Sequence, residues 1–227
     1  MFVQPNSLAA TLDAVDEALF YDRTLPEADL EATARWLAAR QVRSGKRAGM
    51  FAPTDRDYGR GVTLFTKEKL QTRLAARNIL TAEAARALTL FGRTSPGVQD
   101  ARQCVDRANR WLSRQCFARD CMVGECAHSG IGLMRYVAVR HGDRAQEWLE
   151  HHLEMLSARR DSKGRWKGLP FYYTLLALTE IDLPSARHEL RYAGPACERV
   201  RKRLSGDDPV ARRRRDVVHR VLSRCTS

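Results

Sequence analysis

Three cysteines and a histidine form the densest cluster of metal-ligating side chains in the sequence. They are spaced as Cys116-x4-Cys121-x4-Cys126-x-His128. Thiolates and an imidazole are soft ligands, and they suit Zn²⁺ in preference to an iron–sulfur cluster. The spacing differs from the usual Cys-x2-Cys pair, so it predicts a metal site without naming a zinc-binding fold. Cys104, on the preceding predicted helix, could replace one of the four ligands.

Two other interpretations of this cluster are open. Cys116 and Cys126 could be small buried apolar residues, with Cys121 exposed. Cys126 and His128 could instead form a thiolate–imidazole pair for nucleophilic catalysis. The sequence identifies no third residue that would orient such a pair, so the catalytic residues stay unknown and enzyme activity stays undecided.

Aromatic side chains gather around the start of the most apolar segment of the chain. They are Trp166, Phe171, Tyr172 and Tyr173. In a helical fold these rings could line an apolar ligand cavity, with the two tyrosine hydroxyls as its polar contacts. The alternative is that they pack in the core, where a buried tyrosine hydroxyl needs a hydrogen-bond partner.

The formal net charge of +12 is unevenly distributed along the chain. Residues 1–30 hold six acids and one base, residues 31–78 four acids and eleven bases, and residues 185–227 five acids and twelve bases. An excess of Arg and Lys favours anionic partners such as nucleic acid, and Arg212–Arg215 are the candidate phosphate contacts. Consecutive residues spread around a helix and cannot form one stripe, so a solvated Arg-rich surface is the alternative.

Length and composition are those of a globular protein. A chain of 227 residues, 44% hydrophobic and 29% charged, can bury a sizeable core. The longest apolar runs are far too short to span a membrane, and the N-terminus lacks the pattern of a signal peptide, which predicts a cytoplasmic location. The six cysteines are expected to be thiols rather than a secreted disulfide framework.

Helical periodicity dominates the chain, and no alternating strand pattern appears. The predicted helices cover residues 8–20, 25–41, 66–77, 82–91, 95–116, 129–139, 143–159 and 170–179, and three more begin near Pro184, Pro195 and Pro209. Residues 43–62 and 117–127 are predicted loops. The elements form one all-helical domain of 227 residues: an acidic N-terminal helix region (1–30), a repeat core (31–180) and basic C-terminal helices (181–227).

Cap residues mark the predicted helix starts. Ser7 is expected to cap the first helix through its hydroxyl. Thr24 and Glu27 lie three residues apart, as a capping box requires, and Thr81 is expected to cap the helix over residues 82–91.

Similar segments recur along the chain. They are Trp36–Arg47, Trp111–Gln115 and Met155–Trp166. Gly45 aligns with Gly164 without a gap, and the middle copy reaches Gly124 after a short insertion. Because an apolar helix follows each copy, the pattern predicts tandem two-helix hairpins that stack to bury their apolar faces. The alternative is chance similarity within an Ala-, Leu- and Arg-rich helical protein.

The third copy, Arg160-x3-Gly164-x-Trp166 followed by Thr174, resembles the Gln-x3-Gly-x-Trp repeat of the terpenoid cyclase and protein prenyltransferase α/α toroids, with Arg in place of Gln. Gln41-x3-Gly45-x-Arg47 matches with Arg in place of Trp. The resemblance covers about residues 30–180. It implies helix pairs around a central axis with a ligand cavity at their inner ends. Three clear copies imply a partial or small toroid, or an open solenoid. The Asp-rich acid motif of the cyclases is missing, so their chemistry is not carried over.

The same resemblance adds a second interpretation of the cysteine cluster. Protein prenyltransferases bind zinc with an acid, a Cys and a His, and the acid lies close to the Cys. Here Glu125 adjoins Cys126, and His128 is local rather than distant in sequence. The resemblance therefore makes Glu125 a candidate ligand-site residue.

These observations support three functional hypotheses. The first is a helical-repeat interaction protein that binds a partner of unknown identity and holds a structural metal. The second is an α/α-toroid enzyme acting on a prenyl-like or other apolar substrate. The third is a basic nucleic-acid-binding protein. The first is favoured because no complete catalytic set can be assembled from the sequence.

Overall fold

A computed structural model of the chain describes residues 2–94, 99–140, 142–204 and 208–225, and the predicted all-helical fold class is confirmed there. The α-helices are α1 (Leu8–Phe20), α2 (Glu27–Arg40), α3 (Asp55–Arg60), α4 (Arg73–Thr94), α5 (Gln99–Leu112), α6 (Glu125–Ala138), α7 (Asp143–Ser157), α8 (Phe171–Thr179), α9 (Pro184–Arg201) and α10 (Pro209–Cys225). A 3-10 helix, η1 (Cys116–Ala118), lies between α5 and α6. Over the described residues, extended pairing is limited to three isolated bridges.

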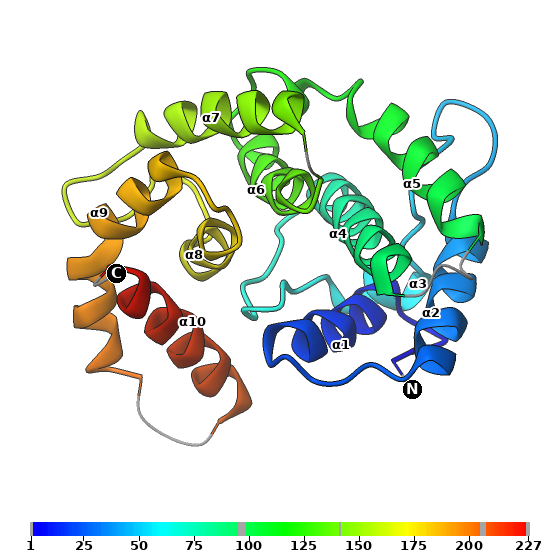
Figure 1. Ribbon diagram of the computed structural model, residues 1–227, viewed down its shortest axis with the longest axis horizontal. Coiled ribbons are helices and arrows are strands. Elements are labelled where there is room, and N and C mark those ends of the chain that lie inside the picture. Colours follow the sequence, from blue (N-terminus) through cyan, green and yellow to red (C-terminus); the bar gives the residue numbers. More distant parts are fainter. Residues whose placement is uncertain (1, 95–98, 141, 205–207, 226–227) are drawn as a thin grey trace.

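The helices alternate between inner and outer positions. Figure 1 shows α1, α4, α6, α8 and α10 inside an outer arc of α2, α5, α7 and α9. Neighbouring inner helices pack on one another, and α10 returns to α1, where Arg213 Nη1 lies 2.8 Å from Asp13 Oδ1 and the Tyr21 hydroxyl donates to Asp216 Oδ2 at 2.7 Å. The chain therefore runs outward and inward in successive helix pairs, while membership of the α/α-toroid family stays a prediction.

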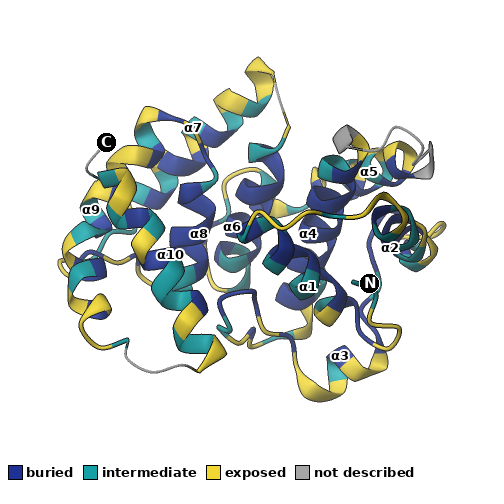
Figure 2. Cartoon of the chain, turned by 60° about the horizontal axis from the view of Figure 1, so that its bottom comes forward, coloured by how far each residue is buried: buried dark blue, intermediate teal, exposed yellow. Residues whose placement is uncertain are grey.

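The core lies along the inner helices. In α6 every residue from Ser129 to Val137 is buried, and in α8 every residue except Tyr172 is buried (Figure 2). Apolar residues of the N-terminal region, the repeat core and the C-terminal helices all belong to one hydrophobic cluster. None of the described helices combines the length and the apolar character that crossing a membrane would require.

The connections that follow the outer helices α2 and α7 share one backbone feature. Gln41 pairs with Phe51 after α2, and Arg160 pairs with Trp166 after α7, each through an antiparallel bridge. Phe51 is therefore the structural counterpart of Trp166, in place of Arg47, which the sequence alignment suggested. Gly45, Gly124 and Gly164 all have positive φ, but only Gly164 packs tightly, against Ala196 of α9. The three glycines thus share a positive φ and not an environment.

Gly49 is a second glycine in the first connection, and its environment is tighter than that of Gly45. A Cβ on Gly49 would lie 2.2 Å from the backbone oxygen of Arg107 in α5, at φ +98°, whereas Gly45 has φ +76° and open space around it. We expect Gly49→Ala to lower the free energy of unfolding by about 3 kcal/mol, because strain and a backbone clash add. Gly45→Ala should lose only about 1 kcal/mol, from strain alone. Urea unfolding of both variants measures the difference, and equal losses would contradict the close approach to α5.

The region of residues 63–94 differs from its prediction. Two helices were expected, over 66–77 and 82–91, but the chain forms a turn with Lys67 at φ +60° and then one long helix, α4. Residues 63 and 69 pair across this turn, which removes residues 66–72 from any helix. Thr81 is not a cap: its hydroxyl lies inside α4 and accepts a hydrogen bond from the Phe51 amide at 3.2 Å.

Other local predictions are corrected or confirmed. The Ser7 cap is confirmed, since its hydroxyl accepts from the Ala10 amide at 2.9 Å. The Thr24 capping box is wrong, because α2 has Pro26 at its cap position without a side-chain hydrogen bond. Pro195 lies inside α9 rather than at a helix start, and the preceding Gly194 has no Cβ to clash with the proline ring. The expected start of the helix over 95–116 lies outside the described residues.

The predicted loop over residues 43–62 contains α3. Its capping box joins Thr54 and Asp57, and the Asp57 carboxylate also accepts from the Leu8 amide at 3.0 Å. A short charged helix was overlooked because it has no apolar stripe, and it is held by capping rather than by burial.

Candidate metal centre

The three cysteines of the sequence cluster lie in the connection between α5 and α6. Cys116 begins η1, Cys121 follows it, and Cys126 is in the first turn of α6. The Cys121 amide donates to the Cys116 carbonyl at 3.3 Å, which folds the loop back on itself. Gly124, at φ +53°, then turns the chain into α6. The backbone therefore brings together thiols that are ten residues apart.

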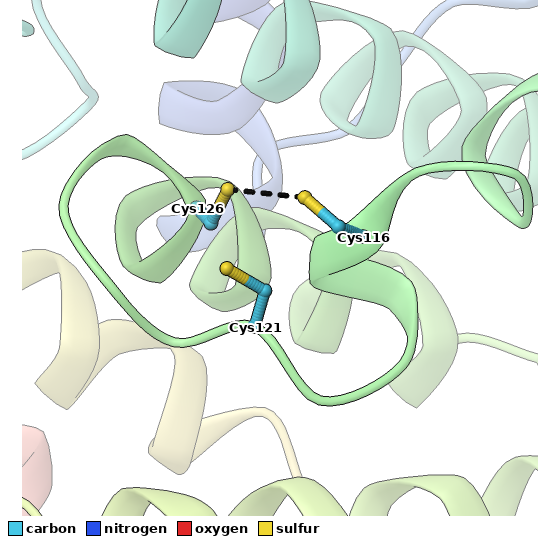
Figure 3. A group of neighbouring side chains, drawn as sticks. All are labelled: Cys116, Cys121 and Cys126. Atoms are coloured by element: carbon cyan, nitrogen blue, oxygen red, sulfur yellow. Dashed lines mark hydrogen bonds between the residues drawn. The ribbon is translucent and has the colours of Figure 1, made fainter.

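The thiol geometry fits one metal ion. The Sγ atoms of Cys116, Cys121 and Cys126 all lie within 4.8 Å of one another, and Cys116 Sγ and Cys126 Sγ are 3.3 Å apart (Figure 3). Tetrahedral zinc with bonds of about 2.3 Å places its sulfur ligands about 3.8 Å apart. The Cys116–Cys126 separation is about 0.5 Å shorter than this value and none of the separations exceeds 4.8 Å, so small side-chain rotations would seat a zinc ion.

The surroundings of Cys121 and Cys126 shift the pKa values of their thiols in opposite directions. A backbone hydrogen bond from the Val123 amide, together with a side-chain hydrogen bond from the Cys126 thiol, lowers the pKa of Cys121. Burial and the neighbouring thiols raise the pKa of Cys126 to about 12. A metal displaces these protons, because zinc binds the thiolate and not the thiol. Cys116 is exposed and Cys121 half-buried, so the alternative that placed Cys116 in the core is wrong.

The other predicted ligands lie outside this group. Among the described residues the metal-ligating group consists of the three cysteines, without His128 or Cys104. His128 is bonded to the backbone of Gly168, and burial lowers its pKa. Cys104 is buried on α5 and its Sγ accepts from Arg107 Nη2 at 3.3 Å.

Glu125 opens α6 beside Cys126. One of its carboxylate oxygens is buried without a hydrogen-bond partner in the structure, although the residue as a whole is half-buried. Its charge also raises the pKa of His128 against the larger effect of burial. Glu125 is thus near both candidate ligands in sequence, but it is not a member of the three-cysteine group.

The predicted aromatic site is packed rather than open. Trp166 is buried and its Nε1 donates to Glu189 Oε2 at 2.7 Å, while the buried Tyr173 hydroxyl donates to Glu83. Phe171 is buried between Trp166 and Tyr172, with ring centroids 6.5 and 5.3 Å away. These contacts favour core packing, the second interpretation of these residues.

Tyr172 differs from the other three aromatic residues because it is half-buried. The guanidinium of Arg214 lies 4.8 Å from the centre of its ring. Arg214 also donates to the backbone oxygens of Thr66 and Lys67, so this pair joins α10 to the turn before α4.

The four consecutive arginines spread around α10, as expected for a helix. Arg213 is buried and pairs with Asp13 and Glu17, while Arg212 is exposed and Arg214 and Arg215 are half-buried. Arg215 Nη1 donates to the Leu204 carbonyl at 3.5 Å. Most of this run therefore connects α10 to its neighbours.

The structure also contains a buried charged cluster that the sequence reasoning overlooked. We call it the central charge cluster, and its members are Asp16, Glu83, Arg86, Arg135 and Glu180. They come from α1, α4, α6 and the end of α8, at the contacts of the inner helices. The sequence does contain one sign of this cluster, because Arg135 is flanked on both sides by apolar residues of the segment Ile131–Val137. A charge inside an apolar helix needs a buried partner.

No family model matches this chain, and no curated protein or solved structure matches it either. The functional argument therefore depends on the geometry of the described residues. Fold class alone does not assign a function, so the thiol cluster is its starting point.

Proposed function

We propose that this chain is a helical-repeat interaction protein in which Cys116, Cys121 and Cys126 bind a zinc ion that stabilises the connection between α5 and α6. The observation that carries the proposal is the convergence of three Sγ atoms within 4.8 Å. Thiolates select zinc over magnesium or calcium, which prefer oxygen ligands. With three protein ligands, the fourth position is filled by water or by a ligand from outside the cluster.

A structural role follows from what the cysteine loop contacts. The Ala118 carbonyl accepts from Trp148 Nε1 at 2.8 Å, and His152 Nε2 lies 3.4 Å from the Phe117 carbonyl. Both partners belong to α7, the outer helix of the following hairpin. A metal that fixes this loop would therefore also fix the contact between successive helix pairs, which is how repeat proteins gain most of their stability.

The α/α-toroid resemblance remains part of the proposal. It is supported by the alternation of inner and outer helices and by the matching bridges at Gln41 and Arg160. Enzyme activity on an apolar substrate has less support, because Trp166 and Tyr173 are buried and hydrogen-bonded. Nucleic-acid binding has less support because Arg213 and Arg214 are engaged within the fold.

We expect the purified full-length protein to carry one zinc ion per chain. Cys116→Ser, Cys121→Ser and Cys126→Ser should each lose most of the metal, because two thiolates hold zinc far more weakly than three. Cys225→Ser is the matched control, since Cys225 is a half-buried thiol outside the cluster. His128→Ala should keep its zinc. Atomic absorption on each purified variant measures the metal content.

Zinc should also raise the stability of the protein. Binding at a thousandfold excess over the dissociation constant stabilises the folded state by about 4 kcal/mol. Thermal unfolding with and without a chelator measures this effect, which the Cys126→Ser variant should lack. The proposal would be refuted if the wild-type protein binds no metal when zinc is supplied and has the same melting temperature with and without the chelator.

A further inference from the structure

A pocket of about 500 Å³ opens between α5, α6 and α7, and none of the three cysteines lines it. Its volume lies within the range of small-molecule sites. Its lining divides into an apolar part and a charged part, which is the usual division of a site that orients its ligand.

The floor of the pocket is apolar and buried. It consists of Leu112 from α5 and of Leu133 and Val137 from α6. Trp148 of α7 forms a wall, and its ring is fixed by the hydrogen bond to Ala118 and by stacking on His152 at a centroid distance of 3.5 Å. A rigid aromatic wall above an aliphatic floor favours an apolar or aromatic ligand body.

The rim of the pocket is cationic. Arg140 and Arg144 line it together with one acid, Asp143, so guanidinium groups outnumber carboxylates by two to one. Arg140 is held in place, because its Nη1 donates to Asn109 Oδ1 at 2.8 Å. Gly142, the cap residue of the 15-residue helix α7, also lines the pocket and adds the positive end of the helix dipole.

We propose that this pocket binds a small amphipathic anion: an aromatic or aliphatic body with a single sulfonate, carboxylate or phosphate group. The body lies on Leu133 and Val137 against Trp148, and the anionic group contacts Arg140 and Arg144. A neutral ligand would leave the rim unused, and a cationic one would meet two like charges. None of the three cysteines lines this pocket, but its Trp148 wall is held through Ala118 of the cysteine loop.

The test uses two probes that share an aromatic skeleton. 1-Anilinonaphthalene-8-sulfonate carries the anionic group, and N-phenyl-1-naphthylamine lacks it. We expect the full-length protein to bind one equivalent of the anionic probe, with a rise in probe fluorescence, and to bind the neutral probe about tenfold more weakly, since one charge-assisted contact contributes at least 1.4 kcal/mol.

Variants separate the charged rim from the apolar floor. The double variant Arg140→Ala/Arg144→Ala changes exposed side chains, so it should fold and should bind the anionic probe about tenfold more weakly without changing the neutral probe. Ala145→Trp, at the half-buried edge of the pocket, should fill it and abolish binding of both probes. Arg56→Ala, an exposed arginine on α3, is the charge-matched control and should bind like the wild type.

Circular dichroism of each variant checks that the helices are retained. The proposal is overturned if the double variant binds the anionic probe as tightly as the Arg56→Ala control. Equal affinity for the two probes, or binding of many probe molecules without saturation, would equally overturn it, because either result would mean non-specific apolar binding.

Discussion

Replacing Arg135 by Ala should lower the free energy of unfolding by about 3–5 kcal/mol, the loss typical when one partner of a buried ion pair is removed. The side chain of Arg135 is 2% exposed and it contacts all three acids of the central charge cluster. Its Nε and Nη2 donate to the two oxygens of Glu180, both at 2.8 Å. Its removal leaves the three acids with Arg86 as the remaining cation of the cluster.

The geometry predicts that lysine cannot replace Arg135. The two parallel hydrogen bonds to Glu180 need the planar guanidinium fork, and an ammonium group offers a single point charge. We therefore expect Arg135→Lys to recover less than half of the lost stability. Arg144→Ala, an exposed arginine outside the cluster, should change the free energy of unfolding by less than about 0.5 kcal/mol.

Urea unfolding of these three variants, followed by circular dichroism, provides the measurement. A loss for Arg135→Ala no larger than that for Arg144→Ala would contradict the account of the cluster. Because the cluster joins α1, α4, α6 and the end of α8, a large loss would also show that the inner helices depend on it for their mutual packing.

The sequence was informative where a local signal was strong. Ser7 as a cap and the apolar segments that became α6 and α8 follow from hydrogen bonding and periodicity, which act within one turn of helix. The three cysteines were also recognisable, because ligands ten residues apart can meet in one loop.

What could not be predicted depends on contacts between distant segments. Thr81 looks like a helix cap in the sequence, but it lies inside α4. Its hydroxyl accepts a hydrogen bond from the Phe51 amide, 30 residues away. His128 looks like a fourth ligand, but tertiary packing places it against Gly168. The partners of Arg135 are 45 to 119 residues distant, so no window of sequence contains them.

Glu83 should make the stability of the protein depend on pH. The cluster contains three carboxyl groups and two guanidinium groups, so one bound proton would make it neutral. Burial raises the pKa of Glu83 to about 7, whereas the contacts with Arg135 and Arg86 lower the pKa of Glu180 in spite of its burial. Glu83 is therefore the group that holds the proton, and its Oε2 is buried without a partner in the structure.

The direction of this pH dependence follows from the protonation of Glu83 in the folded and in the unfolded chain. Below about pH 4.5 Glu83 is protonated in both the folded and the unfolded chain, so it contributes no pH dependence. Between about 4.5 and 7 the unfolded chain loses this proton while the folded chain keeps it, so stability falls as pH rises. Above 7 both states are ionised and the loss is complete, at about 3 kcal/mol for a shift of this size.

Glu83→Gln tests this account, because the amide keeps the shape of the side chain and never ionises. The variant should be close to wild type at pH 4.5 and more stable than wild type at pH 8, by up to about 3 kcal/mol. Glu180→Gln should instead be less stable than wild type throughout this pH range. The lowered pKa of Glu180 means that its charge stabilises the fold at neutral pH, and this stabilisation is lost as pH falls.

Urea unfolding of the wild type and both variants, at intervals from pH 4.5 to 8, separates the two carboxyl groups. The difference between Glu83→Gln and wild type should grow between about pH 4.5 and 7 and then level off. The loss in Glu180→Gln should be nearly constant across the window, because the lowered pKa of Glu180 places its titration below pH 4.5. If both variants are less stable than wild type by the same amount at pH 8, the ionised carboxylate of Glu83 does not destabilise the fold at that pH. The raised pKa would then not belong to Glu83, and the central charge cluster would hold a net negative charge below pH 7 as well.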